Sequence, residues 1–242
     1  MKHDMTPREE QTLLSLLDAG DLLGAKEFLT SRDQVAPNRP SVIYHLGFIN
    51  RLMNRLSEAV GYYRRAIALA PNVATFHLAL GVALQQQGEL SQALEAIRNA
   101  VCLEPSNANA WNSLGLTQKM SGAVADALKS YRRAQELVVS AAFEKLTQRD
   151  PMLLSAREGN GGKKSMVVAP EFFPECKSEL RADLLYATVM NNIGGCYLAL
   201  GSVADAQRAF LESIEFIPDG VHYAPPFTGL AASGLTHPSD QE

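Results

Sequence analysis

The order of apolar and polar residues between positions 74 and 106 predicts two short helices joined by a turn. Leucine and valine crowd the first half of the stretch, and the polar run 85–88 interrupts it. Pro105 ends the second half, because proline lacks the amide hydrogen that a helix interior needs. The apolar residues of the second half recur at spacings of three and four: Leu90, Ala93, Leu94, Ile97, Ala100 and Val101.

The same pattern returns along the chain with a fixed period. Gly47, Gly81 and Gly115 stand 34 residues apart, and prolines and small alanines of neighbouring copies keep this spacing. Self-similarity at a fixed period indicates a repeat architecture. We place repeats at 6–39, 40–73, 74–107 and 108–141, and a fifth, out of phase, at 187–220.

The repeated glycines indicate where two helices approach closely. Glycine inside a helix costs about 1 kcal/mol relative to alanine. Four glycines at one equivalent position, the fourth being Gly194, therefore suggest that a neighbouring helix leaves no room for a side chain. Because one helix pair cannot bury its apolar face alone, successive pairs are expected to stack into one elongated core.

The fourth copy carries the residues that identify a family: Trp111, Leu114, Gly115, Ala127, Tyr131 and Ala134. This pattern resembles the tetratricopeptide repeat, in which large, Leu-Gly, small and aromatic residues keep set places. Gln118 and Val139 depart from it, where an aromatic residue and a proline are usual. The resemblance implies an all-α fold, a right-handed α-solenoid of helix-turn-helix repeats over residues 1–220.

The first repeat begins with the signals of a helix start. Thr6 offers a capping hydroxyl, and Pro7 suits the first turn. Glu9 and Glu10 place negative charge at the positive end of the helix dipole. We expect a helix to begin here, with a polar outer face that caps the stack.

Residues 142–186 interrupt the repeats. Because Val139 replaces the terminating proline, the second helix of repeat four is expected to continue to Asp150 and Pro151. The next helix is expected to begin early, so that the lengthened pair projects from the solenoid with 151–178 as an irregular tip. The glycine-rich part of the tip lacks the spacing of a phosphate-binding loop. The tip is either a plain or locally packed loop, or a docking segment for a partner or for the protein's own groove.

The tail 221–242 is rich in proline and glycine and is not expected to form a further repeat or a polar capping helix. The last repeat would then expose an apolar face. Three possibilities stay open: packing of Tyr223, Phe227 or Leu230 over this face, self-association through it, and a disordered tail.

In the tetratricopeptide family, the first helices of successive repeats line a concave groove through positions two, five, nine and twelve. Carried over by register, the resemblance implies a peptide-binding groove that combines apolar side chains with asparagine amides, which can hydrogen-bond a peptide backbone. Its residues are Tyr44, Phe48, Arg51, Leu78, Val82, Gln85, Asn109, Asn112, Leu116, Lys119, Asn191, Gly195 and Leu198.

Two readings of this groove stay open. An apolar stripe of Phe48, Val82 and Leu116 favours ligand burial, and Gly195 would permit a close approach. Alternatively, these residues contact the inserted segment or line an unused face. The clamp by which some family members hold a C-terminal carboxylate is disfavoured, because Tyr44 and Phe48 occupy places that need Lys and Asn.

Three arginines, Arg64, Arg98 and Arg132, occupy equivalent places in the second helices. They suit a basic stripe for an acidic partner, but Glu95 and Glu136 lie at helical spacing from Arg98 and Arg132. We therefore expect solvated local ion pairs, each contributing only tenths of a kcal/mol.

The composition restricts location and chemistry. A net charge of −4 gives no footprint for nucleic acid, and no segment resembles a secretory leader or a membrane span. The odd count of three cysteines, without a CxxC pair, indicates reduced thiols and a cytoplasmic location rather than a zinc site. The histidines have no metal-ligand spacing, and no nucleophile or cofactor motif appears. We expect no cofactor, no metal and no catalysis.

These observations favour a non-catalytic adaptor or scaffold that binds a peptide segment of another protein in its groove, for complex assembly or client escort. Two alternatives remain. One is a structural subunit that polymerises through its open C-terminal end, which would make the protein a homo-oligomer. The other, less favoured, is an enzyme whose chemistry lies in residues 142–186.

Overall fold

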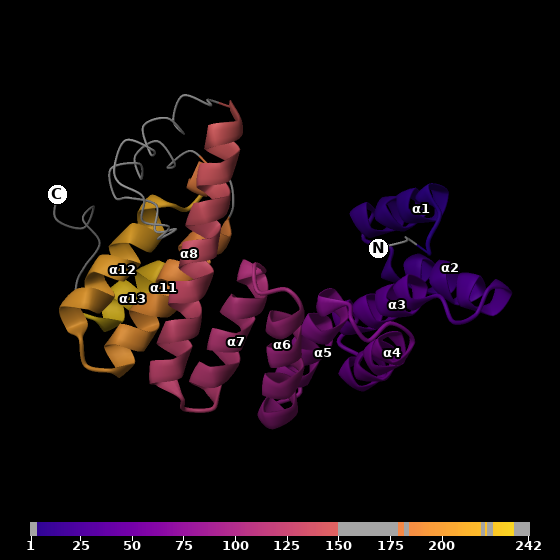
Figure 1. Cartoon of the computed structure of the whole chain (residues 1–242), viewed down its shortest axis with the longest axis horizontal. Helices are drawn as coiled ribbons and strands as arrows, with labels where there is room; N and C mark the ends of the chain where they lie inside the picture. The colour runs from indigo at the N-terminus through magenta and orange to yellow at the C-terminus, as the bar shows by residue number, and fades with distance from the viewer. Residues whose placement is uncertain (1–3, 150–178, 182–183, 219–220, 222–224, 235–242) are drawn as a thin grey trace, which may run out of the picture. The chain divides into compact units, whose positions relative to one another are not determined.

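The period of the sequence reappears in the residues at which helices begin. The computed structural model describes residues 4–149, 179–181, 184–218, 221 and 225–234, and every regular element in these ranges is an α-helix (Figure 1). The helices are α1 (Pro7–Asp18), α2 (Leu22–Val35), α3 (Pro40–Leu52), α4 (Leu56–Leu69), α5 (Ala74–Gln86), α6 (Leu90–Leu103), α7 (Ala108–Met120), α8 (Val124–Arg149), α11 (Leu184–Ala199), α12 (Val203–Glu215) and α13 (Pro225–Ala232). From α2 to α8, each helix begins 34 residues before the equivalent helix of the next repeat.

Consecutive helices pack as pairs, which confirms the predicted all-α architecture of helix-turn-helix repeats. The chain divides into two compact units, which we describe separately. Met1–Pro105 contains α1 to α6, and Ser106–Glu242 contains α7 to α13. Within the described ranges, no helix is both long and apolar enough to cross a membrane.

The repeated glycines lie where the two helices of a pair touch, as predicted. A Cβ atom on Gly115 would lie 2.8 Å from the ring of Tyr131 in α8, a distance that real side chains do not show. The glycines and the residues they face are Gly47 with Tyr63, Gly81 with Ile97, Gly115 with Tyr131, and Gly194 with Phe210. Glycine at this position therefore allows the second helix to place a large side chain directly on the first helix.

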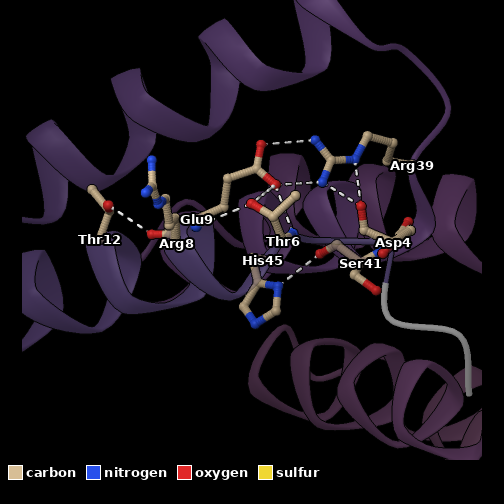
Figure 2. Close-up of polar contacts among 8 residues, drawn as sticks. All are labelled: Asp4, Thr6, Arg8, Glu9, Thr12, Arg39, Ser41 and His45. Carbon is tan, nitrogen blue, oxygen red and sulfur yellow. Dashed lines mark hydrogen bonds and ion pairs between the residues drawn. The ribbon is translucent and has the colours of Figure 1, made fainter.

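The start of α1 carries the predicted cap by the Thr6 hydroxyl, and Glu9 completes it as a capping box. The Glu9 amide donates to the Thr6 hydroxyl over 3.3 Å, and the Thr6 amide donates to the Glu9 carboxylate over 2.8 Å (Figure 2). Two backbone amides that the helix leaves without partners are thereby satisfied.

Arg39 ties this capping box to the start of α3. Its guanidinium donates to both carboxylate oxygens of Glu9, over 3.0 Å and 2.6 Å, and to the backbone carbonyl of Asp4 (Figure 2). The Asp4 carboxylate accepts in turn from the amide of Ser41 at 3.0 Å. Hydrogen bonds from Arg39 and Thr6 lower the pKa of Glu9 to about 2.

In the second unit, α8 is 26 residues long and extends well past the point at which α6 ends by register. Its added turns bury Phe143, which shares a core cluster with Leu180, Tyr186 and Phe216. The hydroxyl of Tyr186 donates to the carboxylate of Glu212 over 2.5 Å. The predicted tip, 151–178, lies outside the described residues.

A short helix, α13, packs against α11 and α12 at the C-terminal end of the second unit (Figure 1). A Cβ atom on Gly229 would lie 2.5 Å from the Phe210 ring, so this ring is held between Gly194 and Gly229. α13 is short and apolar rather than a polar cap, and it realises the first of the three possibilities left open for the tail, packing over the last repeat. Proline at Pro225 and Pro226 suits a helix start, where an amide hydrogen is not needed.

Candidate functional site

The first helices of neighbouring repeats lie side by side within each unit, α3 beside α5 and α7 beside α11. The predicted groove residues are thus distributed over two surfaces. The α3–α5 face carries Tyr44, Phe48, Arg51, Leu78, Val82 and Gln85. The α7–α11 face carries Asn109, Asn112, Leu116, Lys119, Asn191, Gly195 and Leu198.

An arginine stacked on an aromatic ring is the main feature of the α3–α5 face. The guanidinium of Arg51 lies over the Phe48 ring, 5.4 Å from its centroid. Both side chains are half-buried, as are Leu78 and Val82 on α5. Burial raises the pKa of Tyr63 to about 12, and the nearby Arg51 opposes this shift. The face therefore combines apolar area with one fixed positive charge.

Two predicted residues of this face serve packing instead. The Tyr44 ring stacks on Phe76, with centroids 5.1 Å apart, and also contacts Tyr63. Burial raises the pKa of Tyr44, so the phenol stays neutral. Gln85 is only 9 % exposed, which leaves little of it for a ligand. Its assignment as a groove contact is therefore corrected: the position twelve residues into this repeat faces inward.

Amide groups connect the two helices of the α7–α11 face. The side-chain amide of Asn192 donates to the side-chain oxygen Oδ1 of Asn112 over 3.0 Å. Asn112 is therefore already engaged, whereas Asn109 is exposed and Asn191 half-buried. Repeat register selects Asn191, one residue earlier, and so missed Asn192. The adjacent asparagine in the sequence was the available signal.

Lys119 and Gly195 meet at the centre of the α7–α11 face. A Cβ atom on Gly195 would lie 2.6 Å from the Lys119 ammonium nitrogen. Gly195 thus makes room for Lys119 rather than for a ligand backbone. Leu116, which is 37 % exposed, supplies apolar area beside this charge, and Leu198 is half-buried on α11.

The Cys196 thiol is buried in α11. Burial raises the pKa of Cys196, with the Lys119 charge opposing the shift, so the thiol stays protonated and is a poor nucleophile and metal ligand. No group of three or more His, Cys, Asp or Glu side chains within the described ranges is placed to hold a metal ion.

The predicted ion pair between Arg132 and Glu136 in α8 is not the one that forms. Arg132 lies over the Tyr197 ring instead of pairing with Glu136, and donates to its hydroxyl over 2.5 Å. Glu136 pairs with Arg133 at 2.8 Å. In the first unit, Arg64 donates to Gln92 over 2.8 Å.

Two family models match the middle of the chain. A family model described as tetratricopeptide repeat matches residues 78–142, and a second, described as TPR repeat, matches residues 47–88. Residues 47–142 of this chain thus match the tetratricopeptide repeat. Repeats of this family are generally non-catalytic interaction modules, so the fold supports a role in protein–protein interaction.

Solved structures agree on the fold. A structure of MamA from Desulfovibrio magneticus RS-1, from residue 41 to its end, is 16% identical, with a TM-score of 0.60, and the match covers 86% of this chain and 92% of that one. YrrB, described as a TPR protein with an unusual peptide-binding site, is 16% identical, with a TM-score of 0.57 and coverage of 97% and 94%. TTC0263, a thermophilic TPR protein from Thermus thermophilus, is 16% identical, with a TM-score of 0.60 and coverage of 94% and 98%. No curated protein matches the sequence.

Proposed function

We propose that this tetratricopeptide-repeat protein is a non-catalytic adaptor that captures a peptide segment of another protein. The observation that carries the proposal is the α3–α5 face, where the Phe48 ring lies beneath Arg51 on α3, and α5 carries the half-buried side chains Leu78 and Val82. Apolar side chains of a peptide gain about 25 cal/mol for each Å² that they bury on such a surface. The fixed guanidinium favours a peptide that carries a carboxylate nearby.

The α7–α11 face is proposed as a second contact surface, chosen for backbone recognition. Asn109 and Asn191 retain amide groups toward solvent, and an extended peptide presents unpaired N–H and C=O groups to them. Lys119 adds a positive charge. Both faces thus select a segment that combines apolar and acidic residues, and complex assembly or client escort would follow from holding such a segment.

Two further observations support peptide capture over polymerisation through the C-terminal end. α13 packs on α11 and α12, where an open end was expected. The structural neighbour YrrB is described as having a peptide-binding site. We also propose a cytoplasmic location, because Cys102 and Cys196 are both free thiols.

A peptide-display selection on the immobilised full chain tests the proposal. We expect selected peptides to combine aromatic or aliphatic residues with Asp or Glu, and to shift amide NMR signals of α3 and α5 before those of α4 and α6. Replacing Arg51 with Glu should weaken their binding at least tenfold, since it reverses the charge of the face. Enrichment of no peptide, or shifts confined to α4 and α6, would reject the assignment.

A further inference from the structure

A hollow of about 260 Å³ lies between α4, α5 and α6; it shares α5 with the α3–α5 face but is lined by other side chains of that helix. Its apolar lining includes Ile67, Leu80 and Leu84, and polar side chains at its edge include Arg64 and Glu95. A cavity of about 150 Å³ is large enough to hold benzene. The hollow is therefore of the size of one aromatic side chain.

The second unit fills the equivalent place with its own tyrosine. By repeat register, Leu84 corresponds to Tyr197, and Arg64 corresponds to Arg132. The Arg132 guanidinium lies 5.8 Å from the centroid of the Tyr197 ring and donates to the Tyr197 hydroxyl over 2.5 Å. The first unit keeps the arginine but has leucine in place of the tyrosine.

Leu84 also differs from the residues at the same position in the second and fourth repeats. At its position, Asn50 accepts a hydrogen bond from Lys26 at 3.0 Å. Gln118 accepts one from the Ser130 hydroxyl at 2.7 Å. Each of these side chains thus has a polar partner on a second helix. Leu84 has no polar group, so this arrangement is missing in the third repeat.

We propose that the hollow binds a tyrosine side chain of a partner protein, which takes the place that Tyr197 occupies in the second unit. The ring lies on Leu80, above Leu84, which is itself 3% exposed. The Arg64 guanidinium keeps its bond to Gln92 at 2.8 Å and donates a further hydrogen to the phenol oxygen. The phenol proton is donated to the Glu95 carboxylate, which lines the same hollow. A phenol thereby satisfies both charged groups at the edge.

The same geometry discriminates against related side chains. Phenylalanine fills the apolar part but leaves Arg64 and Glu95 without the hydroxyl partner. Phosphotyrosine has no phenol proton to donate to Glu95, and its charge of about −1.5 to −2 is repelled by Glu95 and attracted by Arg64. We expect the lost donor and the repulsion to outweigh the attraction, so that the site prefers unmodified tyrosine and phosphorylation of the partner releases it.

The test uses N-acetyl-L-tyrosinamide as the probe and methyl NMR signals of the full chain as the readout. We expect it to shift the signals of Ile67, Leu80 and Leu84 with a dissociation constant on the order of 1 mM. N-acetyl-L-phenylalaninamide should bind at least threefold more weakly, and the O-phosphorylated probe at least tenfold more weakly. Arg64→Gln should remove the preference for tyrosine, whereas Arg98→Gln, the equivalent arginine of the next repeat, should leave it unchanged.

A second variant tests occupancy of the hollow. Leu84→Tyr should supply the missing ring from within the chain and reduce probe binding at least tenfold; should it fail to fold, the comparison of Arg64→Gln with Arg98→Gln decides alone. Absence of shifts at these methyl groups up to 10 mM probe, or equal binding of the tyrosine and phenylalanine probes, would overturn the proposal. Neither result bears on peptide capture by the α3–α5 face, which uses other side chains.

Discussion

The two units repeat one backbone pattern but present different chemistry on the faces of their first helices. The α3–α5 face places Arg51 on the Phe48 ring in α3 and carries half-buried aliphatic side chains on α5. The α7–α11 face joins Asn112 to Asn192 and places Lys119 against Gly195. The repeat thus fixes the buried positions that hold helix to helix, and leaves the exposed positions free to specify what each unit binds.

The largest expected effect comes from disrupting the helix contact at glycine that the two units share. Gly115→Val should lower the free energy of unfolding of the second unit by about 3 kcal/mol, because its branched side chain overlaps the Tyr131 ring. Gly61→Ala is the matched control. Gly61 lies in α4 with no atom within 4 Å of its Cβ position, so alanine should stabilise the first unit by about 0.5–1 kcal/mol. Urea unfolding measures both, and a neutral Gly115→Val would show that the helix contact is loose.

A smaller effect addresses the difference between Leu84 and Tyr197. Tyr197→Leu should destabilise the second unit by about 2 kcal/mol, through lost ring burial and the lost bond to Arg132. Leu84→Tyr should cost the first unit less than about 1 kcal/mol, since the hollow already has room for the ring. Thermal unfolding of the two variants compares these costs. Equal costs would mean that the hollow beside Leu84 does not accommodate a tyrosine ring as the surroundings of Tyr197 do.

The smallest effect concerns the Arg39 network, which belongs to the first unit alone. The pKa of Glu9 is lowered to about 2, so its contribution to stability is full above pH 4.5 and is lost as the pH falls from 4.5 toward 2. After screening by solvent, Arg39→Gln should cost about 1–2 kcal/mol at pH 7, and less at pH 3. Arg8→Gln, which alters an exposed arginine of α1 next to Glu9, should leave the free energy of unfolding unchanged at both pH 7 and pH 3. A cost of Arg39→Gln that does not depend on pH would contradict this origin.

The sequence predicted those parts of the fold that repeat or depend on neighbouring residues. The glycine contacts follow from the 34-residue period, and the Thr6 capping box follows from four adjacent residues. α13 was missed because the composition of the tail outweighed the Pro-Pro helix start. Repeat register names positions but not the neighbours that cover them. It therefore could not show that Gln85 is buried or that Arg132 turns to Tyr197.

The most direct test of peptide capture is the affinity of a display-selected peptide, measured by calorimetry, for two matched double variants of the first unit. Phe48→Ser with Val82→Ser alters the α3–α5 face, while Leu69→Ser with Leu103→Ser alters leucines of α4 and α6 that are 42% and 40% exposed. Circular dichroism checks that helix content is retained in both. We predict that the first pair weakens binding at least 30-fold and that the second pair changes it less than twofold. Equal affinity of the two variants, with helix content intact, would contradict the account.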